Sequence, residues 1–191
     1  IGNRMDKQAQ EIENTVPGAE VTRVGEGINV TFDESSGVYF ATESYRLNEK
    51  SENTLNQLAK IFKEYPKSLI LVEGHTDDKK VVENSYLIDN WDLSVRRAAA
   101  IVRLLQDRFD VAPEKLIAAG RSSYHPLVEN NSADNRAKNR RTRIVILPNL
   151  DKFLALLDSE NQSTTSTDRD LQQQSETEME INTETGSGID E

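Results

Sequence analysis

Cysteine is absent from the 191 residues, and only two histidines are present. A chain without cysteine forms no disulfide, binds no metal through thiolates and has no thiol nucleophile. Long apolar runs are also missing, because no stretch approaches the roughly 20 residues of a membrane-spanning helix. No signal peptide is recognisable. The sequence starts at Ile1 rather than Met, so we expect a fragment or processed form whose export signal, lipid-bearing cysteine or membrane anchor lies upstream.

Negative charge is abundant but unevenly placed along the chain. The net charge is −10, and residues 158–191 contain ten acidic residues and one arginine, which leaves a charge of −1 for residues 1–157. A nearly neutral body lacks the clustered cations of a nucleic-acid-binding protein, so we expect no nucleic-acid partner. Residues 158–191 also contain almost no apolar side chains, and we expect a disordered acidic tail because burial cannot offset the ordering entropy.

The apolar pattern predicts alternating strands and helices. Expected strands are a hairpin at 20–24 and 28–32, then 69–73, 116–119 and 143–147, and expected helices run from Ser51 or Asn53 to Tyr65 and over 95–108. This alternation is typical of an α/β (α+β) sandwich with helices on one face of a sheet. Residues 3–15 are expected to form a helix with a thin apolar face, which we interpret as a linker or anchor stem rather than as part of the core. We therefore expect a stem at 1–18, one domain at 19–157 that an amphipathic segment at 150–157 can close, and the tail at 158–191.

The most informative polar residues lie between Val72 and Arg97. Asp77 follows the apolar strand just after Gly74, at the kind of strand end where ligand groups are often displayed. Asn90, Asp92 and Ser94 all precede the apolar pattern of the next helix, and each has a side chain suited to capping it. Our choice of cap is Ser94, which places Arg97 in the first turn.

A carboxylate at a strand end and a guanidinium at a helix start predict a cleft for a zwitterion. Asp77 would accept hydrogen bonds from an ammonium group, and Arg97 would hold a carboxylate as a two-pronged donor. Backbone N–H groups at the helix start would add to the carboxylate contact. The alternative is a structural Asp77–Arg97 salt bridge or two unrelated solvated charges, and the residues alone leave both interpretations open.

Three separated motifs resemble the OmpA-like C-terminal domain family, which includes Pal-type lipoproteins and flagellar stator B subunits. They are G-H-T-D at 74–77, N-x-x-L-S-x-x-R-A at 90–98 and N-R-R at 139–141, and the resemblance covers about residues 28–147. It implies a β-α-β-α-β-β sandwich that binds peptidoglycan non-covalently through diaminopimelate, without catalysis, cofactor or metal. By the same resemblance, Asp77 and Arg97 grip the two charged ends of diaminopimelate, and Asn90 and Arg140 line the site.

The resemblance also implies a place in the cell. The expected location is the outer membrane, with the domain facing the periplasm and touching the membrane only through an upstream anchor; a homodimer is left open. The segment N-W-D-L-S at 90–94 is more like the stator branch, so a wall anchor of a motor protein is the alternative. Two features depart from the family: a long insert at 78–89, and F-A-T-E at 40–43 where the family has F-D-x-x.

Other residues permit further interpretations. His75 with Asp77 and Asp78 suggests a metal-dependent wall hydrolase, but no His-x-x-x-His pair accompanies them, and we favour a structural His75. Trp91 either packs over the ligand or plugs the helix end. The basic run at 136–143 lacks interleaved aromatic residues. If it continues into a strand, Arg140 points to the face opposite its neighbours.

Overall fold

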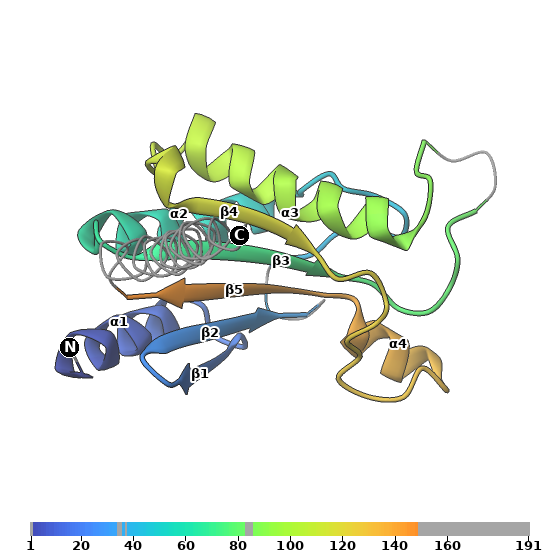
Figure 1. Ribbon diagram of the computed structural model, residues 1–191, viewed down its shortest axis with the longest axis horizontal. Helices are drawn as coiled ribbons and strands as arrows, with labels where there is room; N and C mark the ends of the chain where they lie inside the picture. Colours follow the sequence, from blue (N-terminus) through green and yellow to red (C-terminus); the bar gives the residue numbers. More distant parts are fainter. Residues whose placement is uncertain (1, 34–35, 37, 83–85, 149–191) are drawn as a thin grey trace, which may run out of the picture. The chain divides into compact units, whose positions relative to one another are not determined.

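The computed structural model describes residues 2–33, 36, 38–82 and 86–148 (Figure 1). The chain divides into two units, Ile1–Leu150 and Asp151–Glu191, and every described element belongs to the first. The predicted closing segment at 150–157 and the acidic tail therefore lie outside the described residues. None of the helices in the described part of the chain is both long and apolar enough to cross a membrane.

A five-stranded sheet forms the centre of the first unit. Its strands lie in the order β1 (Glu20–Val24), β2 (Gly27–Phe32), β5 (Arg141–Leu147), β3 (Leu69–His75) and β4 (Leu116–Gly120). Only the β3–β4 pair is parallel; the other neighbours are antiparallel. The predicted hairpin and the three later strands are all present, and the predicted α/β sandwich is confirmed.

Helices cover one face of this sheet. The register aligns Ile28, Ile146 and Ile70 in one row across three strands, and all three side chains are fully buried. Above them lie α1 (Gly2–Thr15), α2 (Glu49–Glu64) and α3 (Asn90–Asp107), whose apolar residues join the same core. The short elements are η1 (Pro113–Lys115) and α4 (Ala133–Asn139). The first unit is thus a two-layer sandwich.

Helix α1 belongs to the core, which corrects our expectation of a stem that stands apart from it. Met5, Ala9 and Ile12 are buried in the main hydrophobic cluster, and α1 contacts α2, β1 and β2. The thin apolar stripe that we interpreted as too weak for a core helix is sufficient, because it packs into the angle between α2 and the hairpin.

The starts of two helices also differ from the predictions. Helix α2 begins at Glu49, where Asn48 is the cap and its side chain accepts a hydrogen bond from the Ser51 backbone N–H. The Ser51 hydroxyl instead bonds the backbone of Tyr39. Helix α3 begins at Asn90, and its cap is Asp89, whose carboxylate accepts from the Asp92 N–H at 2.8 Å.

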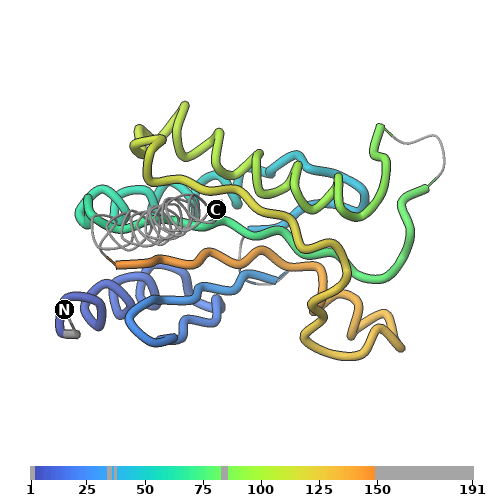
Figure 2. The backbone as a smooth tube through the Cα atoms, viewed as in Figure 1, coloured from blue at the N-terminus to red at the C-terminus, as the bar shows by residue number. Residues whose placement is uncertain are grey.

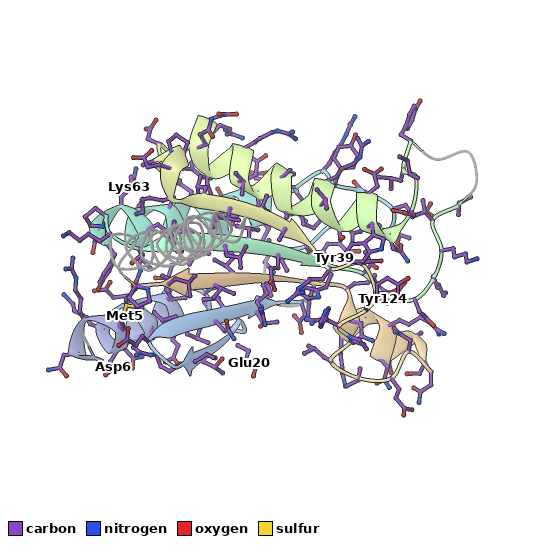
Figure 3. The ribbon with its side chains drawn as sticks, viewed as in Figure 1. Met5, Asp6, Glu20, Tyr39, Lys63 and Tyr124 are labelled. Carbon is purple, nitrogen blue, oxygen red and sulfur yellow. The ribbon has the colours of Figure 1, made fainter. Side chains whose placement is uncertain are left out.

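Several connections converge at the carboxyl end of β3. The chain after β3, the connection from β4 to α4, and α4 itself all lie at this end of the sheet (Figure 2). Tyr124, in the connection after β4, lies there too, whereas Met5 of α1 lies at the opposite end (Figure 3). Segments that are far apart in the sequence are therefore available to build a site at one place.

Candidate functional site

Two glycines allow α3 to lie directly against the sheet. A side chain on Gly74 would meet the backbone of Ser94, with a Cβ only 3.0 Å from its carbonyl carbon. A side chain on Gly120 would lie 2.7 Å from the Val95 nitrogen. The buried Ser94 hydroxyl donates to the Trp91 carbonyl at 2.9 Å and accepts from the Ser122 N–H at 3.1 Å. This close packing fixes α3 against the end of β3.

Asp77 lies two residues beyond β3 and is 7% exposed. Its Oδ2 accepts a hydrogen bond from Nη1 of Arg140 at 2.8 Å, and its Oδ1 accepts from the Lys79 backbone N–H at 2.9 Å. Arg140 directly precedes β5, at the end of α4. Asp77 therefore forms an ion pair with Arg140, whose role as its partner the sequence did not predict.

Arg97 projects from α3 and is 5% exposed. Its Nε donates to the Ser44 carbonyl at 2.8 Å, its Nη2 donates to the Ala41 carbonyl at 3.1 Å, and its guanidinium lies 5.3 Å from the centre of the Phe40 ring. Because α3 begins at Asn90 rather than after Ser94, Arg97 is the eighth helical residue and not part of the first turn. Its orientation is set by the turn at 41–44.

Asn90 ties the chain after Asp77 to α3. Its Nδ2 donates to the Lys79 carbonyl at 2.9 Å and to the Asp77 carbonyl at 3.3 Å. The Val82 N–H, further along the same segment, donates to Oε1 of Glu43 at 2.6 Å. Glu43 lies in the turn at 41–44, with a positive φ of 52°. Residues 79–82 are thus held from two sides of the site.

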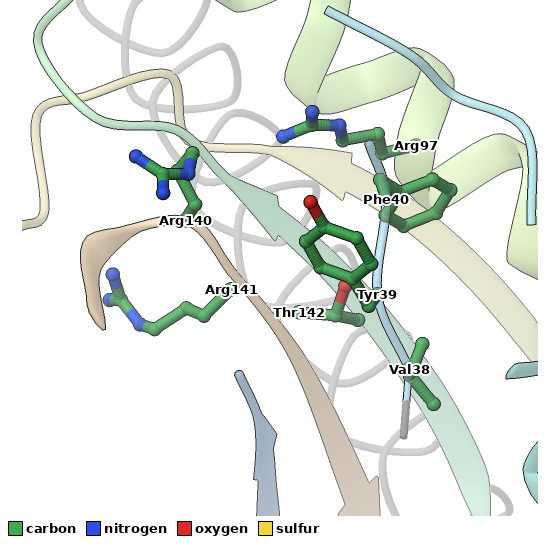
Figure 4. Close-up of a pocket in the computed structure, with 7 residues that line it drawn as sticks. All are labelled: Val38, Tyr39, Phe40, Arg97, Arg140, Arg141 and Thr142. Atoms are coloured by element: carbon green, nitrogen blue, oxygen red, sulfur yellow. The ribbon is translucent and has the colours of Figure 1, made fainter. Parts of the chain in front are cut away.

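All four residues predicted from sequence line one cleft of about 410 Å³. Asp77, Asn90, Arg97 and Arg140 share its wall with Thr42, Glu43, Thr76, Lys79, Lys80, Val81, Val82, Leu93, Ala133 and Arg136. A smaller pocket of about 10 Å³ adjoins it, also lined by Arg97 and Arg140, together with Arg141 and the hydroxyl-bearing Tyr39 and Thr142 (Figure 4). Charged groups of both signs therefore face one space, as recognition of a zwitterion requires.

The segments that build the cleft also match those of a known protein family. A family model described as the OmpA family matches residues 39–140, more than half of the chain. The chain belongs to the OmpA family. The match extends from the Phe40 turn to Arg140, and so it contains every residue that lines the cleft.

Three relatives illustrate the range of the OmpA family. Motility protein B of Bacillus subtilis (strain 168) is 29% identical over 68% of this chain and 48% of its own length. The probable lipoprotein YiaD of Escherichia coli (strain K12) is 28% identical over 78% and 65%. The peptidoglycan-associated lipoprotein of Buchnera aphidicola is 28% identical over 56% and 59%. The chain thus spans about half to two thirds of each relative.

Solved structures show the same fold. A MotB-like protein from Desulfovibrio vulgaris superposes with a TM-score of 0.69 at 24% identity, covering 76% of this chain and 95% of that one. The cell wall anchor of the type VI secretion system from Pseudomonas aeruginosa gives a TM-score of 0.62 at 28% identity, covering 76% and 97%. The first likeness establishes the OmpA-like fold, and the second adds a protein described as a wall anchor.

Sequence reasoning missed several residues of the OmpA-family cleft. Glu43 stands in the F-A-T-E segment, where we noted only the loss of the family's aspartate. Lys79 and Lys80 open the insert, which we treated as a departure of unknown shape. Arg136 belongs to the basic run, and its Nε lies 2.8 Å from Oδ1 of Asp78. These four residues could have been found from the sequence because each is a charged residue in a segment that flanks one of the motifs.

His75 lies beneath the site rather than in it. Its ring is 3% exposed, it does not line the cleft, and its Nε2 lies 3.5 Å from Oε2 of Glu73. Burial lowers the pKa of His75. Glu73 is also close to Arg143, at 2.8 Å. The close contact with His75 and the charges of Arg143 and Arg121 together lower the pKa of Glu73 to about 2, against the effect of burial.

Trp91 lies at the surface beside α3, and it is 48% exposed. Its ring centre is 5.5 Å from that of Tyr124, which is also exposed, and the two rings are tilted by 32°. The ring contacts the connection after β4 instead of closing the end of the helix. Trp91 does not line the cleft.

Proposed function

We propose that this domain binds diaminopimelate-type peptidoglycan non-covalently and so tethers an envelope protein to the cell wall. The observation that carries the proposal is the convergence of Asp77, Asn90, Arg97 and Arg140 on one cleft within an OmpA-family domain. The names of two relatives support it, since one is a peptidoglycan-associated lipoprotein and another is a cell wall anchor. The four residues come from distant parts of the sequence, and the fold brings them together.

The chemistry of the cleft suits the free end of diaminopimelate, where one carbon carries an ammonium and a carboxylate. In our proposal the ammonium binds the Asp77 carboxylate, which the Arg140 guanidinium already orients at 2.8 Å. The carboxylate binds the Arg97 guanidinium. Because the Ser44 and Ala41 carbonyls hold Arg97 in place, little side-chain entropy is lost when the ligand binds.

The proposed role is binding and not catalysis. The hydrolase alternative relied on His75 as an acid or base beside Asp77 and Asp78, but the His75 ring packs against Glu73 and does not line the cleft. The low pKa of Glu73 and the burial of His75 instead suit a structural pair beneath the site. We propose that the domain faces the periplasm and is attached to the outer membrane by an anchor upstream.

A second candidate is the wall anchor of a motor protein of the stator type. The likeness to motility protein B of Bacillus subtilis and to the MotB-like structure favours it. Both candidates use the same cleft and differ in the attachment. An upstream membrane-spanning helix with an acidic residue inside the membrane would favour the motor protein, and a lipoprotein signal would favour the outer membrane.

Co-sedimentation with purified insoluble peptidoglycan tests the proposed function. We expect wild type to pellet with a diaminopimelate wall and to stay soluble with a wall that has lysine in its place. Asp77→Asn and Arg97→Met should stay soluble with both walls, and higher salt should weaken wild-type binding because the contacts are ionic. The matched control is Lys60→Met, a change of one charge on the exposed side of α2.

Each variant must be shown to be folded, because both Asp77 and Arg97 are buried. Circular dichroism and thermal unfolding supply this check. If folded Asp77→Asn and Arg97→Met pellet as well as wild type does, both residues are structural and the proposed ligand contacts are wrong.

A further inference from the structure

The cleft carries more positive charge than a zwitterion needs. Among the residues that the structure describes, five cationic side chains line it, namely Lys79, Lys80, Arg97, Arg136 and Arg140, and two carboxylates do, Glu43 and Asp77. Asp78 adds a third carboxylate at the edge through its ion pair with Arg136. These described side chains sum to two positive charges, whereas the whole chain has a net charge of −10.

Most of these charges already have a defined partner. Asp77 pairs with Arg140 and Asp78 pairs with Arg136, each at 2.8 Å. The Glu43 carboxylate accepts a hydrogen bond from the Val82 N–H. The ammonium groups of Lys79 and Lys80 differ: both side chains are exposed, and among the residues that the structure describes neither is recorded in an ion pair or side-chain hydrogen bond.

The backbone that carries the two lysines is held in place. The Lys79 N–H donates to Asp77 Oδ1 at 2.9 Å, and the Lys79 carbonyl accepts from Asn90 at 2.9 Å. The Val82 N–H is bound to Glu43. Lys79 and Lys80 therefore start from a fixed position next to Asp77, so their flexible side chains reach only the neighbouring part of the cleft.

A ligand with one ammonium and one carboxylate is neutral and leaves this excess uncompensated. We propose that Lys79 and Lys80 form a second anionic subsite, which binds another carboxylate of the same stem peptide. This inference rests on the proposed function, because it places the first carboxylate at Arg97. The other carboxylates of the stem peptide lie beyond the far end of the diaminopimelate side chain from the bound ammonium and carboxylate. Lys79 and Lys80 line the same cleft beside Asp77, and their long, flexible side chains extend toward that part of the ligand.

Two groups of a stem peptide have the required chemistry. One is the α-carboxylate of the γ-linked glutamyl residue that precedes diaminopimelate, and the other is the carboxylate at the end of the peptide. Amidation removes the charge of either group with little change in size. The subsite therefore predicts that this domain distinguishes the free acid of the peptide from its amide.

Isothermal titration calorimetry with soluble peptides tests the subsite. The probes are L-Ala-γ-D-Glu-meso-diaminopimelate as the free acid, the same peptide amidated at the glutamyl α-carboxylate, and the same peptide amidated at its C-terminal carboxylate. At low salt we expect wild type to bind the free acid about 1.5- to 5-fold more tightly than one of the two amides, the range for exposed charge pairs. The amide that loses affinity identifies the group that Lys79 and Lys80 bind.

Two double variants make the test specific. The double variant Lys79→Met with Lys80→Met should bind all three peptides equally. Its affinity should match that of wild type for the amide that wild type binds more weakly. Lys60→Met with Lys63→Met removes the same charge from the exposed side of α2 and should keep the wild-type preference.

The outcomes separate this inference from the proposed function. If wild type binds none of the peptides, the proposed function is wrong. If wild type binds all three peptides equally, or if the Lys79 and Lys80 double variant keeps the preference, the second subsite is wrong and the binding of diaminopimelate stands.

Discussion

Replacement of Gly74 by alanine tests how the packing of α3 against β3 supports the site. The Gly74 position has no side chain because the Ser94 backbone of α3 occupies the space where a Cβ would lie. The opposing atoms belong to the backbone, so a change of rotamer cannot make room. We expect α3 to move away from β3 in the Gly74→Ala protein.

The size of the effect follows from the contact distances. A Cβ on Gly74 would be 3.0 Å from the Ser94 carbonyl carbon, whereas carbon atoms in contact are about 3.5–4.0 Å apart. The Ser94 carbonyl oxygen would lie closer still, so the helix must move by on the order of 1 Å. Overpacking of a core costs about 1–3 kcal/mol, and because backbone opposes the new methyl group we expect about 3 kcal/mol. For a domain of this size that corresponds to a fall in Tm of roughly 6–12 °C.

Ligand binding should weaken as well. Arg97 follows Ser94 by three residues on α3, whereas Asp77 is fixed to the end of β3, so a displaced helix changes the distance between the two ligand-binding groups. A site displaced by about 1 Å commonly loses its function. We expect the binding of diaminopimelate peptides to weaken at least tenfold at temperatures where Gly74→Ala is fully folded.

Urea unfolding and calorimetric titration with the tripeptide measure the two effects. The control is Gly25→Ala in the β1–β2 turn, where nothing lies within 4 Å of an added Cβ but φ is +57°. This substitution should cost about 1 kcal/mol through backbone strain alone and leave binding unchanged. If Gly74→Ala is within 0.5 kcal/mol of wild type (roughly the scatter of surface substitutions) and binds normally, the tight packing of α3 on β3 is not what positions Arg97.

Three further predictions concern stability. Glu73 has a lowered pKa of about 2 in the folded protein against an ordinary value of 4.5. The stability that its ionised carboxylate contributes is therefore present above pH 4.5 and disappears as the pH falls toward 2. Urea unfolding should show Glu73→Gln to be less stable than wild type by on the order of 3 kcal/mol at pH 6 and equally stable near pH 2. Gln8 is fully buried, and its amide atoms have no hydrogen-bond partner among the described residues; Gln8→Met should therefore raise the urea midpoint by an amount worth about 1 kcal/mol, and an unchanged or lower midpoint would indicate a partner for the amide. Asn139 is fully buried and its side chain makes four hydrogen bonds with Leu127, Val128 and Asn130; Asn139→Ala should cost about 2–4 kcal/mol and increase hydrogen exchange at the Leu127 and Val128 amides, whereas wild-type exchange there would contradict this role.

The strands were predictable from the sequence because their burial follows a simple alternation. In β2, Ile28, Val30 and Phe32 face the core and the residues between them do not. In β3 the apolar run ends at Gly74, and Asp77 follows at the strand end where the motif places it. Local sequence therefore determines both the sheet and the place where the cleft begins.

Helix starts were less predictable because several capping side chains compete within a few residues. Ser94 and Ser51 looked suitable as caps, but their hydroxyl groups bond Ser122 and Tyr39, which are distant in sequence. Asp89 and Asn48 perform the capping instead. Only the tertiary structure decides which polar side chain has a better partner elsewhere.

The local sequence also could not predict which groups the charged residues pair with. The Asp77 carboxylate pairs with Arg140, which lies 63 residues further along the chain. Arg97 is oriented by the Ser44 carbonyl, 53 residues earlier. The motifs placed Asp77, Asn90, Arg97 and Arg140 in one cleft, but their contributions to ligand binding stay predictions until the binding experiments are done.

The position of β5 has a consequence for the order in which this protein folds. Among the strands that the structure describes it is the last in the sequence, yet it lies between β2 and β3. Until residues 141–147 have been synthesised, the β1–β2 hairpin and the β3–β4 pair share no hydrogen bonds, and each half exposes an unpaired edge that favours aggregation. Arrival of β5 joins the halves and brings Arg140 to Asp77 in the same step, so a growing chain acquires its sheet and its cleft together, and late.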